Sequence, residues 1–266
     1  MNQLHRDPKL YLQTVKTILS DQQRIPNLPP LVGEMQGSIK TFNFAQVDNI
    51  VKQDPTLAAS ILKIANSALF KRQVAIASLK DAIATLGLGT VQSLVVAHQL
   101  KSLFQTRDKS LNEHLMVRWE STQRLAAFTK KMANLLNMDG DLAYLCAILS
   151  DLGSSLIAQE FPHFQRMDDQ PLFNWVANHY AHLISAHLLQ NWQFEEPLWM
   201  PIKKKGQWQY RSPHGLGLAE LINMCWVHTL NSKATPELQD MPRFNDIPPT
   251  VRILASERQF FLLKEY

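Results

Sequence analysis

Apolar side chains recur at the spacing of α-helices along almost the whole chain. In residues 55–65, for example, Leu57, Ile61 and Ala65 fall on one helical face suited to burial. No segment sustains the alternating apolar and polar pattern of a half-buried strand. The pattern therefore predicts an all-α protein, with helices over residues 9–20, 44–53, 55–65, 79–86, 91–104, 111–136, 142–149, 172–190, 216–230 and 250–263.

Residues 28–100 carry unusually explicit signals for the starts and ends of short helices. Asp54 is a preferred N-cap residue, and Pro55 follows at the first helical position, where a missing N–H costs nothing. Asn43 and Ser78 are predicted to cap two further helices in the same way, and Gly87 stands where a helix ends. These signals predict a compact run of short helices. The preceding helix, 9–20, is expected to pack across this lobe.

Composition narrows the class of protein. At 266 residues, 45% of them hydrophobic and 19% charged, the chain is globular and forms one large domain or two modest ones. Its formal net charge of +4 permits an acidic partner without demanding nucleic acid. Cys146 and Cys225 lie in apolar contexts, which predicts buried free thiols in a reducing cytoplasm. No signal peptide is expected, nor a membrane span of about 18 apolar residues.

Four short motifs recur in an order and spacing that resemble the HDOD domains, output modules of bacterial signalling related to HD-type metal-dependent phosphohydrolases. The motifs are Leu28-Pro29, Asp54-Pro55-x-Leu57, Leu62-x-x-x-Asn66-Ser67 and Ala82-Ile83-x-x-Leu86-Gly87. The resemblance covers roughly residues 25–230 and implies an HDOD-like helical fold. It divides the chain into an N-terminal helix (1–24), an HDOD N-terminal helical lobe (25–105), a degenerate HD-like lobe (106–232) and a C-terminal loop and helix (233–266).

The resemblance also indicates where hydrolase chemistry would lie. HD-type hydrolases hold one or two metal ions with histidines and a His-Asp pair, and the metal generates a hydroxide nucleophile. The His-Asp pair falls at Ser150-Asp151, so a hydroxyl replaces the imidazole. Glu120 stands in place of a histidine, and a final His-His pair falls near Lys203 and Lys204, whose charges repel a metal. The resemblance thus implies a remnant site with no catalytic residue and no expected cofactor.

One alternative keeps hydrolase chemistry at this site. Another histidine of the pattern falls near Ala181 or His182, so Glu120, Asp151 and His182 are weak candidate ligands for Mn, Fe, Zn or Mg. They would give a metal-dependent phosphohydrolase with an atypical site. His179 lies one helical turn from His182 and could join them, although a polar helix face is the favoured interpretation. Asp151 has a simpler interpretation as the N-cap of the following helix.

A third hypothesis rests on a segment that interleaves cations with aromatic rings. Such a composition can bind phosphates and stack bases, which makes nucleic-acid binding an alternative, although a solvated loop is favoured. The segment also supplies candidate contacts to a protein partner or ligand, namely Lys203, Lys204, Lys205, Trp208 and Arg211. The leading hypothesis is a non-catalytic HDOD signal-transduction module that binds signalling proteins or a small nucleotide-like ligand. The sequence defines neither the partner nor an oligomeric state.

Overall fold

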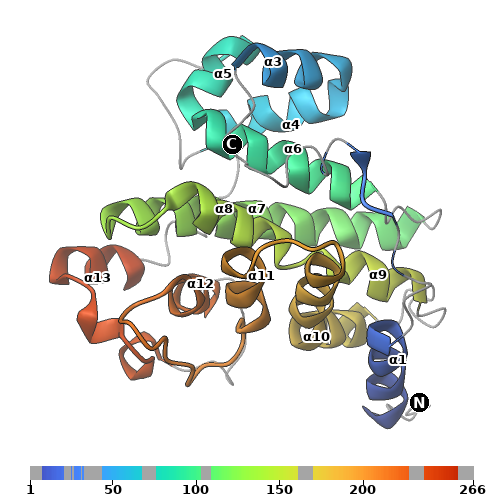
Figure 1. Cartoon of the computed structure of the whole chain (residues 1–266), viewed down its shortest axis with the longest axis vertical. Coiled ribbons are helices and arrows are strands. Elements are labelled where there is room, and N and C mark those ends of the chain that lie inside the picture. The colour runs from blue at the N-terminus through green and yellow to red at the C-terminus, as the bar shows by residue number, and fades with distance from the viewer. Residues whose placement is uncertain are drawn as a thin grey trace.

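The computed structural model describes residues 8–20, 25, 27–30, 32, 44–67, 76–102, 109–160, 170–227 and 237–256 (Figure 1). All regular elements within them are helical, which confirms the all-α prediction. They are α1 (Pro8–Ser20), α3 (Phe44–Gln53), α4 (Pro55–Ala65), α5 (Leu79–Leu86), α6 (Leu88–Ser102), α7 (Lys109–Leu135), α8 (Gly140–Leu149), α9 (Gly153–Glu160), α10 (Gln170–Asn191), α11 (Glu196–Lys203), α12 (Leu218–Val227), the single 3-10 turns η4 (Leu238–Asp240) and η5 (Phe244–Asp246), and α13 (Pro249–Ser256).

The helices α3 to α5 form one end of the molecule, and α6 lies between them and α7 and α8 (Figure 1). Their capping follows the sequence. Asp54 Oδ1 accepts hydrogen bonds from the backbone N–H groups of Thr56 and Leu57, both at 3.0 Å, and Ser78 Oγ caps α5. Gly87 ends α5 with a positive φ of 83°, a conformation that favours glycine. The predicted cap Asn43 lies outside the described residues.

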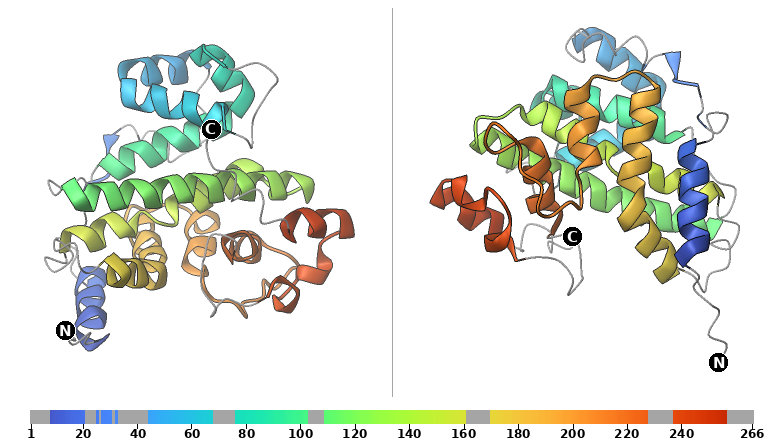
Figure 2. Two further views of the ribbon diagram at one scale, coloured as in Figure 1. Left: turned by 180° about the vertical axis from the view of Figure 1, so that it is seen from behind. Right: turned by 60° about the horizontal axis from the view of Figure 1, so that its bottom comes forward.

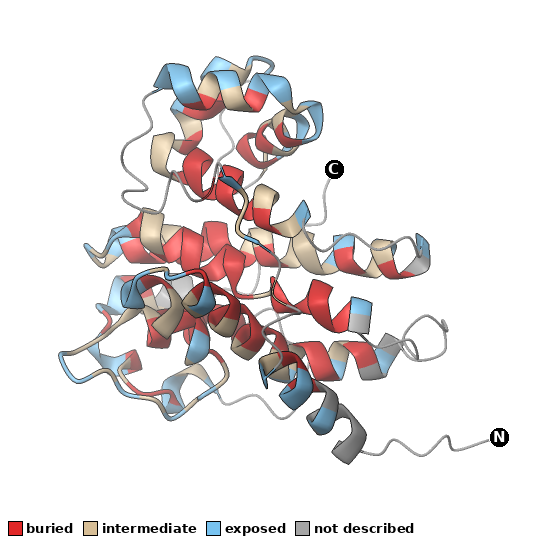
Figure 3. Ribbon diagram, turned by 45° about the vertical axis from the view of Figure 1, so that its right-hand side comes forward, coloured by how far each residue is buried: buried red, intermediate tan, exposed pale blue. Residues whose placement is uncertain are grey.

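The long helix α7 crosses the middle of the molecule beside α8, and α9 to α12 pack on the side away from the first lobe (Figure 2). Buried residues gather where these helices face one another (Figure 3). The stretch Gly140–Gln159 is long and apolar enough to cross a membrane, but 83% of it is buried inside the protein, as in the core of a globular domain. Cys146 and Cys225 are both buried and free, as predicted.

Polar contacts along α7 join it to the first lobe. Lys63 of α4 forms an ion pair with Glu120 at 2.8 Å, and the Lys101 ammonium of α6 lies 4.5 Å from the ring centre of Trp119. Further along, Lys130 donates one hydrogen bond to Thr90 Oγ1 of α6 and another to Asp141 Oδ1 of α8 at 2.6 Å. The predicted domain boundaries near residues 24, 105 and 232 fall in or beside segments outside the described residues, so they stay predictions.

Two expectations about individual elements are wrong. The first helix packs mainly against α10 in the second lobe, whereas we expected it to pack across the first lobe. Helix α11 begins inside the segment 192–197, which the sequence indicates as a connector. Pro197 is tolerated because it lies in the first turn, where no backbone N–H is needed.

The predicted polar loop before the last helix contributes to the core. It contains η4 and η5, and Met241, Phe244 and Ile247 within it are buried. The helix that follows, α13, begins at Pro249 as the sequence indicates.

Candidate functional site

The site of interest lies where α8 ends and the chain turns into α9. Ser150 closes α8, and its hydroxyl donates a hydrogen bond to the carbonyl of Ala147 at 2.8 Å. Asp151 follows in the turn, and α9 begins at Gly153. A Cβ on Gly153 would come within 2.3 Å of the carbonyl oxygen of Ala181, so only glycine lets α9 approach α10 this closely. The turn that carries Asp151 is thereby held against α10.

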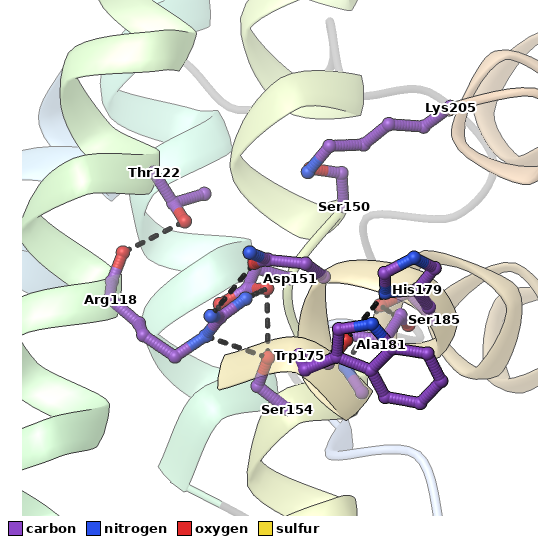
Figure 4. Close-up of polar contacts among 12 residues, drawn as sticks. Arg118, Thr122, Ser150, Asp151, Ser154, Trp175, His179, Ala181, Ser185 and Lys205 are labelled. Carbon is purple, nitrogen blue, oxygen red and sulfur yellow. Dashed lines mark hydrogen bonds and ion pairs between the residues drawn. The ribbon is translucent and has the colours of Figure 1, made fainter. Parts of the chain in front are cut away.

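The carboxylate of Asp151 is bound on both oxygens by Arg118 of α7 (Figure 4). Arg118 Nη2 lies 2.5 Å from Oδ1 and Nε lies 3.0 Å from Oδ2. The same guanidinium donates to Ser154 Oγ and to Asn178 Oδ1, each at 3.1 Å, and the Ser154 hydroxyl donates to Asp151 Oδ1 at 2.8 Å. The side chains of Arg118 and Asp151 are only 16% and 10% exposed. This pair therefore joins α7, α9, α10 and the turn between α8 and α9.

A second cation reaches the same turn from the chain that follows α11. Lys205 is 5% exposed, and its ammonium donates a hydrogen bond to Ser150 Oγ at 2.9 Å (Figure 4). It also lies 4.4 Å from the ring centre of Trp226 on α12. Burial lowers the pKa of Lys205 to about 8; the carboxylate of Asp151 opposes this shift and the charge of Arg118 adds to it.

The turn that presents Lys205 is fixed by two local features. Gly206 has a φ of 81°, in the region that favours glycine, and its N–H donates to Asn223 Oδ1 at 2.8 Å. The Asn223 side-chain amide donates in return to the carbonyl of Lys204 at 3.2 Å. The lysine is thus directed inward by a turn anchored on α12.

His182 of α10 is the buried imidazole of this region, with 7% of the residue exposed. Burial lowers its pKa to about 3, and the positive charge of Lys205 contributes in the same direction. The ring is therefore neutral at physiological pH. His179, one turn earlier, is exposed, and its ring lies against that of Trp175 with centres 4.3 Å apart and planes tilted by 31°. Its Nδ1 donates a hydrogen bond to the Trp175 carbonyl at 2.7 Å.

The family model of the HDOD domain matches residues 25–208, which is more than half of the chain. The protein belongs to the HDOD family. The four motifs of the first lobe had indicated this family, and the match confirms it.

Solved structures share this HDOD fold. A Shewanella amazonensis protein, described provisionally as a metal-dependent phosphohydrolase, is 19% identical with a TM-score of 0.64, over 85% of each chain. A Geobacter sulfurreducens HDOD domain protein of unknown function is 19% identical with a TM-score of 0.54, over 82% of this chain and 77% of its own. A Marinobacter aquaeolei protein, described provisionally as a signal transduction protein, is 19% identical with a TM-score of 0.62, over 94% of this chain and 63% of its own. At these identities the likeness shows the fold alone.

One curated relative is an uncharacterized protein of Treponema pallidum, 23% identical over 210 residues. The match covers 73% of this chain but only 40% of the length of that relative.

The HDOD fold brings some of the predicted site residues together and separates others. Asp151 and His182 are close enough to influence each other electrostatically. Glu120 lies two positions after Arg118 on α7, a rotation of about 200° around the helix, and it faces Lys63 in the first lobe. Glu120 therefore does not converge with Asp151. The side-chain contacts of Asp151 go to Arg118 and Ser154, which is a different role from the helix cap considered above.

The residues around Asp151 do not fit a divalent metal ion. Both carboxylate oxygens already accept bonds from a guanidinium, and an ammonium occupies the position beside Ser150. Within the described parts of the chain, no three or more histidine, cysteine, aspartate or glutamate side chains are grouped so that they could hold a metal.

The cation and aromatic segment does not form one continuous surface. Lys203 is exposed and lies 5.7 Å from the ring centre of Trp199, and Lys204 lies 4.9 Å from that of Tyr210. Lys205 points into the core. Trp208 stacks on Trp226 with ring centres 5.3 Å apart, and Arg211 is exposed.

Sequence reasoning missed Arg118 and did not indicate that Lys205 is buried. Arg118 lies on the buried stripe of α7 that also carries Leu115, Thr122 and Leu125. A charged residue within an apolar stripe was the available signal for a buried partner. Lys205 gave no such signal, because it stands beside two lysines that stay near the surface.

Proposed function

We propose that this HDOD protein is a non-catalytic regulatory module that acts by binding a signalling protein or a small ligand. The observation that supports this most directly is the two-point contact of Arg118 with Asp151. Metal-dependent hydrolysis needs a carboxylate and imidazoles that converge on an ion with an open position for water. Here the carboxylate is committed to an arginine, and a serine hydroxyl bound to an ammonium stands where the imidazole would be.

The alternative of an atypical phosphohydrolase has less support. It requires Glu120, Asp151 and His182 to act on one ion, yet Glu120 pairs with Lys63 on the opposite side of α7. An ion beside Asp151 would also meet two fixed positive charges, and like charges repel strongly where water is excluded.

Nucleic-acid binding through residues 203–211 also has less support, because Lys205 is buried and Trp208 stacks on a neighbouring tryptophan. If such binding occurred it would weaken steeply with added salt. We place the protein in the bacterial cytoplasm as part of the same proposal, a location that suits two buried free thiols.

Metal content and turnover test the proposal together. Protein purified without chelator or metal-affinity resin is incubated with manganese, iron and zinc, desalted, and analysed for bound metal. We expect far less than one ion per chain, and no phosphodiesterase or phosphatase turnover above that of Asp151→Ala. Asp240→Ala, on the exposed turn η4, is the matched control. Near-stoichiometric metal, or turnover lost in Asp151→Ala and kept in Asp240→Ala, would overturn the proposal.

A further inference from the structure

The charges around Asp151 are unbalanced. Arg118 and Lys205 contribute two positive charges and Asp151 one negative charge, while burial keeps His182 neutral. Asp151 is committed to Arg118, so the hydrogen-bond acceptor described for the Lys205 ammonium is the neutral hydroxyl of Ser150. That hydroxyl gives its own proton to the carbonyl of Ala147. A buried ammonium thus lies at the end of α8, and among the residues that the structure describes no carboxylate is in direct contact with it.

This arrangement disfavours folding. A buried charge that lacks a paired opposite charge loses its hydration without full compensation. The negative end of the α8 dipole and the face of Trp226 offset part of that loss. The lowered pKa of Lys205 agrees with an incomplete offset. A methionine would fill a similar volume without the charge, so stability does not explain why a lysine is here.

The position of the two cations suggests what they do. Lys205 reaches Ser150, Arg118 reaches Asp151, and these two positions are adjacent in the turn after α8. We propose that Arg118 and Lys205 keep divalent metal ions out of this turn, and that the chain keeps the buried ammonium for this purpose at a cost in folding stability. The inference rests on the proposed non-catalytic function and names the residues that enforce it.

The double variant Arg118→Met/Lys205→Met tests the exclusion. It leaves the Asp151 carboxylate buried and without its arginine, which creates a demand for a cation. We expect manganese or zinc chloride to raise its melting temperature by several degrees and to leave the wild-type melting temperature unchanged. Adding Asp151→Asn to the double variant should abolish the shift. A folded double variant that shows no metal-dependent shift would overturn the exclusion.

A milder pair gives the answer if the double variant does not fold. Arg118→Gln with Lys205→Met retains a hydrogen-bond donor near Asp151 while removing both charges. We expect manganese or zinc chloride to raise the melting temperature of this variant as well, and a folded variant without that rise would contradict the exclusion.

Lys205→Met alone tests the cost of the ammonium. We expect its melting temperature at neutral pH to equal or exceed that of the wild type. Lys80→Met, at an exposed position on α5, is the control for removing one lysine. A large fall in Lys205→Met that is absent in Lys80→Met would show that the ammonium stabilises the fold.

These results distinguish a failure of the metal-exclusion inference from a failure of the proposed non-catalytic function. Metal bound by the wild-type protein would refute the non-catalytic proposal itself. If the wild type binds no metal and the melting temperature of the double variant does not change with metal, only the proposal that Arg118 and Lys205 exclude metal would be refuted.

Discussion

The ion pair between Arg118 and Asp151 should be among the most important polar contacts for folding stability. Replacing Arg118 with methionine keeps an apolar stem of similar length but removes the guanidinium. The variant loses both bonds to Asp151 and those to Ser154 and Asn178. Because the two charged side chains are 16% and 10% exposed, solvent screens the pair only weakly. Removing one partner of a buried pair typically costs about 3–5 kcal/mol, since the other charge stays buried and uncompensated.

Urea unfolding followed by circular dichroism measures this loss, and a double-mutant cycle assigns its cause. Arg118→Met should lower the free energy of unfolding by about 3–5 kcal/mol, a large share of the roughly 5–15 kcal/mol of an ordinary domain. Arg118→Met/Asp151→Asn should recover much of that loss, because it removes the stranded charge. Lys63→Met of α4 is the matched control, because it removes the partner of Glu120 on the same α7 helix; that pair is 55% and 35% exposed and is worth about 0–1 kcal/mol.

Two results would refute this reasoning. One is an Arg118→Met variant that loses no more stability than Lys63→Met. The other is a double variant whose loss equals the sum of the two single losses, because additivity would mean that Arg118 and Asp151 do not stabilise each other.

Three further predictions concern other parts of the fold. His182 stays neutral in the folded protein, whereas the imidazole of the unfolded chain has a pKa near 6.5, so lowering the pH from 7 to 5 should lower the free energy of unfolding by about 2 kcal/mol through this group. The urea midpoint should fall less between these pH values in His182→Gln than in the wild type, and an equal fall would contradict the assignment. Gly153→Ala should lower the free energy of unfolding by about 1–3 kcal/mol through overpacking against α10. The control Ala59→Ser, on the exposed face of α4, should stay within about 0.5 kcal/mol of the wild type, and equal urea midpoints for the two variants would refute the close approach of α9 and α10. Lys130→Met should cost about 1–2 kcal/mol through lost bonds to Asp141 and Thr90, and a melting temperature within a degree of the wild type would refute it.

Local features of the fold were predictable, because the residues that determine them are neighbours in sequence. Asp54 caps α4 through N–H groups two and three positions away, and Gly87 ends its helix by its own backbone freedom. The packing of α1 on α10 was not predictable in this way, since an apolar helix face specifies burial without specifying its partner. Helix α11 was missed because its 8 residues are too few to show a sustained apolar period.

The site was predictable only as far as the resemblance located it. Alignment with the His-Asp pair pointed to Ser150 and Asp151, and both lie at the turn described above. The partners of these residues come from distant segments, α7 and the turn after α11, which no local pattern connects to them. The resemblance indicated Lys203 and Lys204 as the altered ligands, but Lys205 is the lysine that reaches the site.

The Arg118 guanidinium also performs the joining that a bound ion would otherwise provide. A metal holds separate helices together through ligands that each helix supplies. Here Arg118 connects α7 with α9, α10 and the turn after α8. Because these connections belong to the chain itself, a chelator cannot remove them. We therefore expect protein purified without chelator to have the same melting temperature before and after the addition of excess EDTA, as measured by circular dichroism. A fall on adding EDTA that zinc or manganese restores would mean that an ion, and not these side chains, holds the helices together.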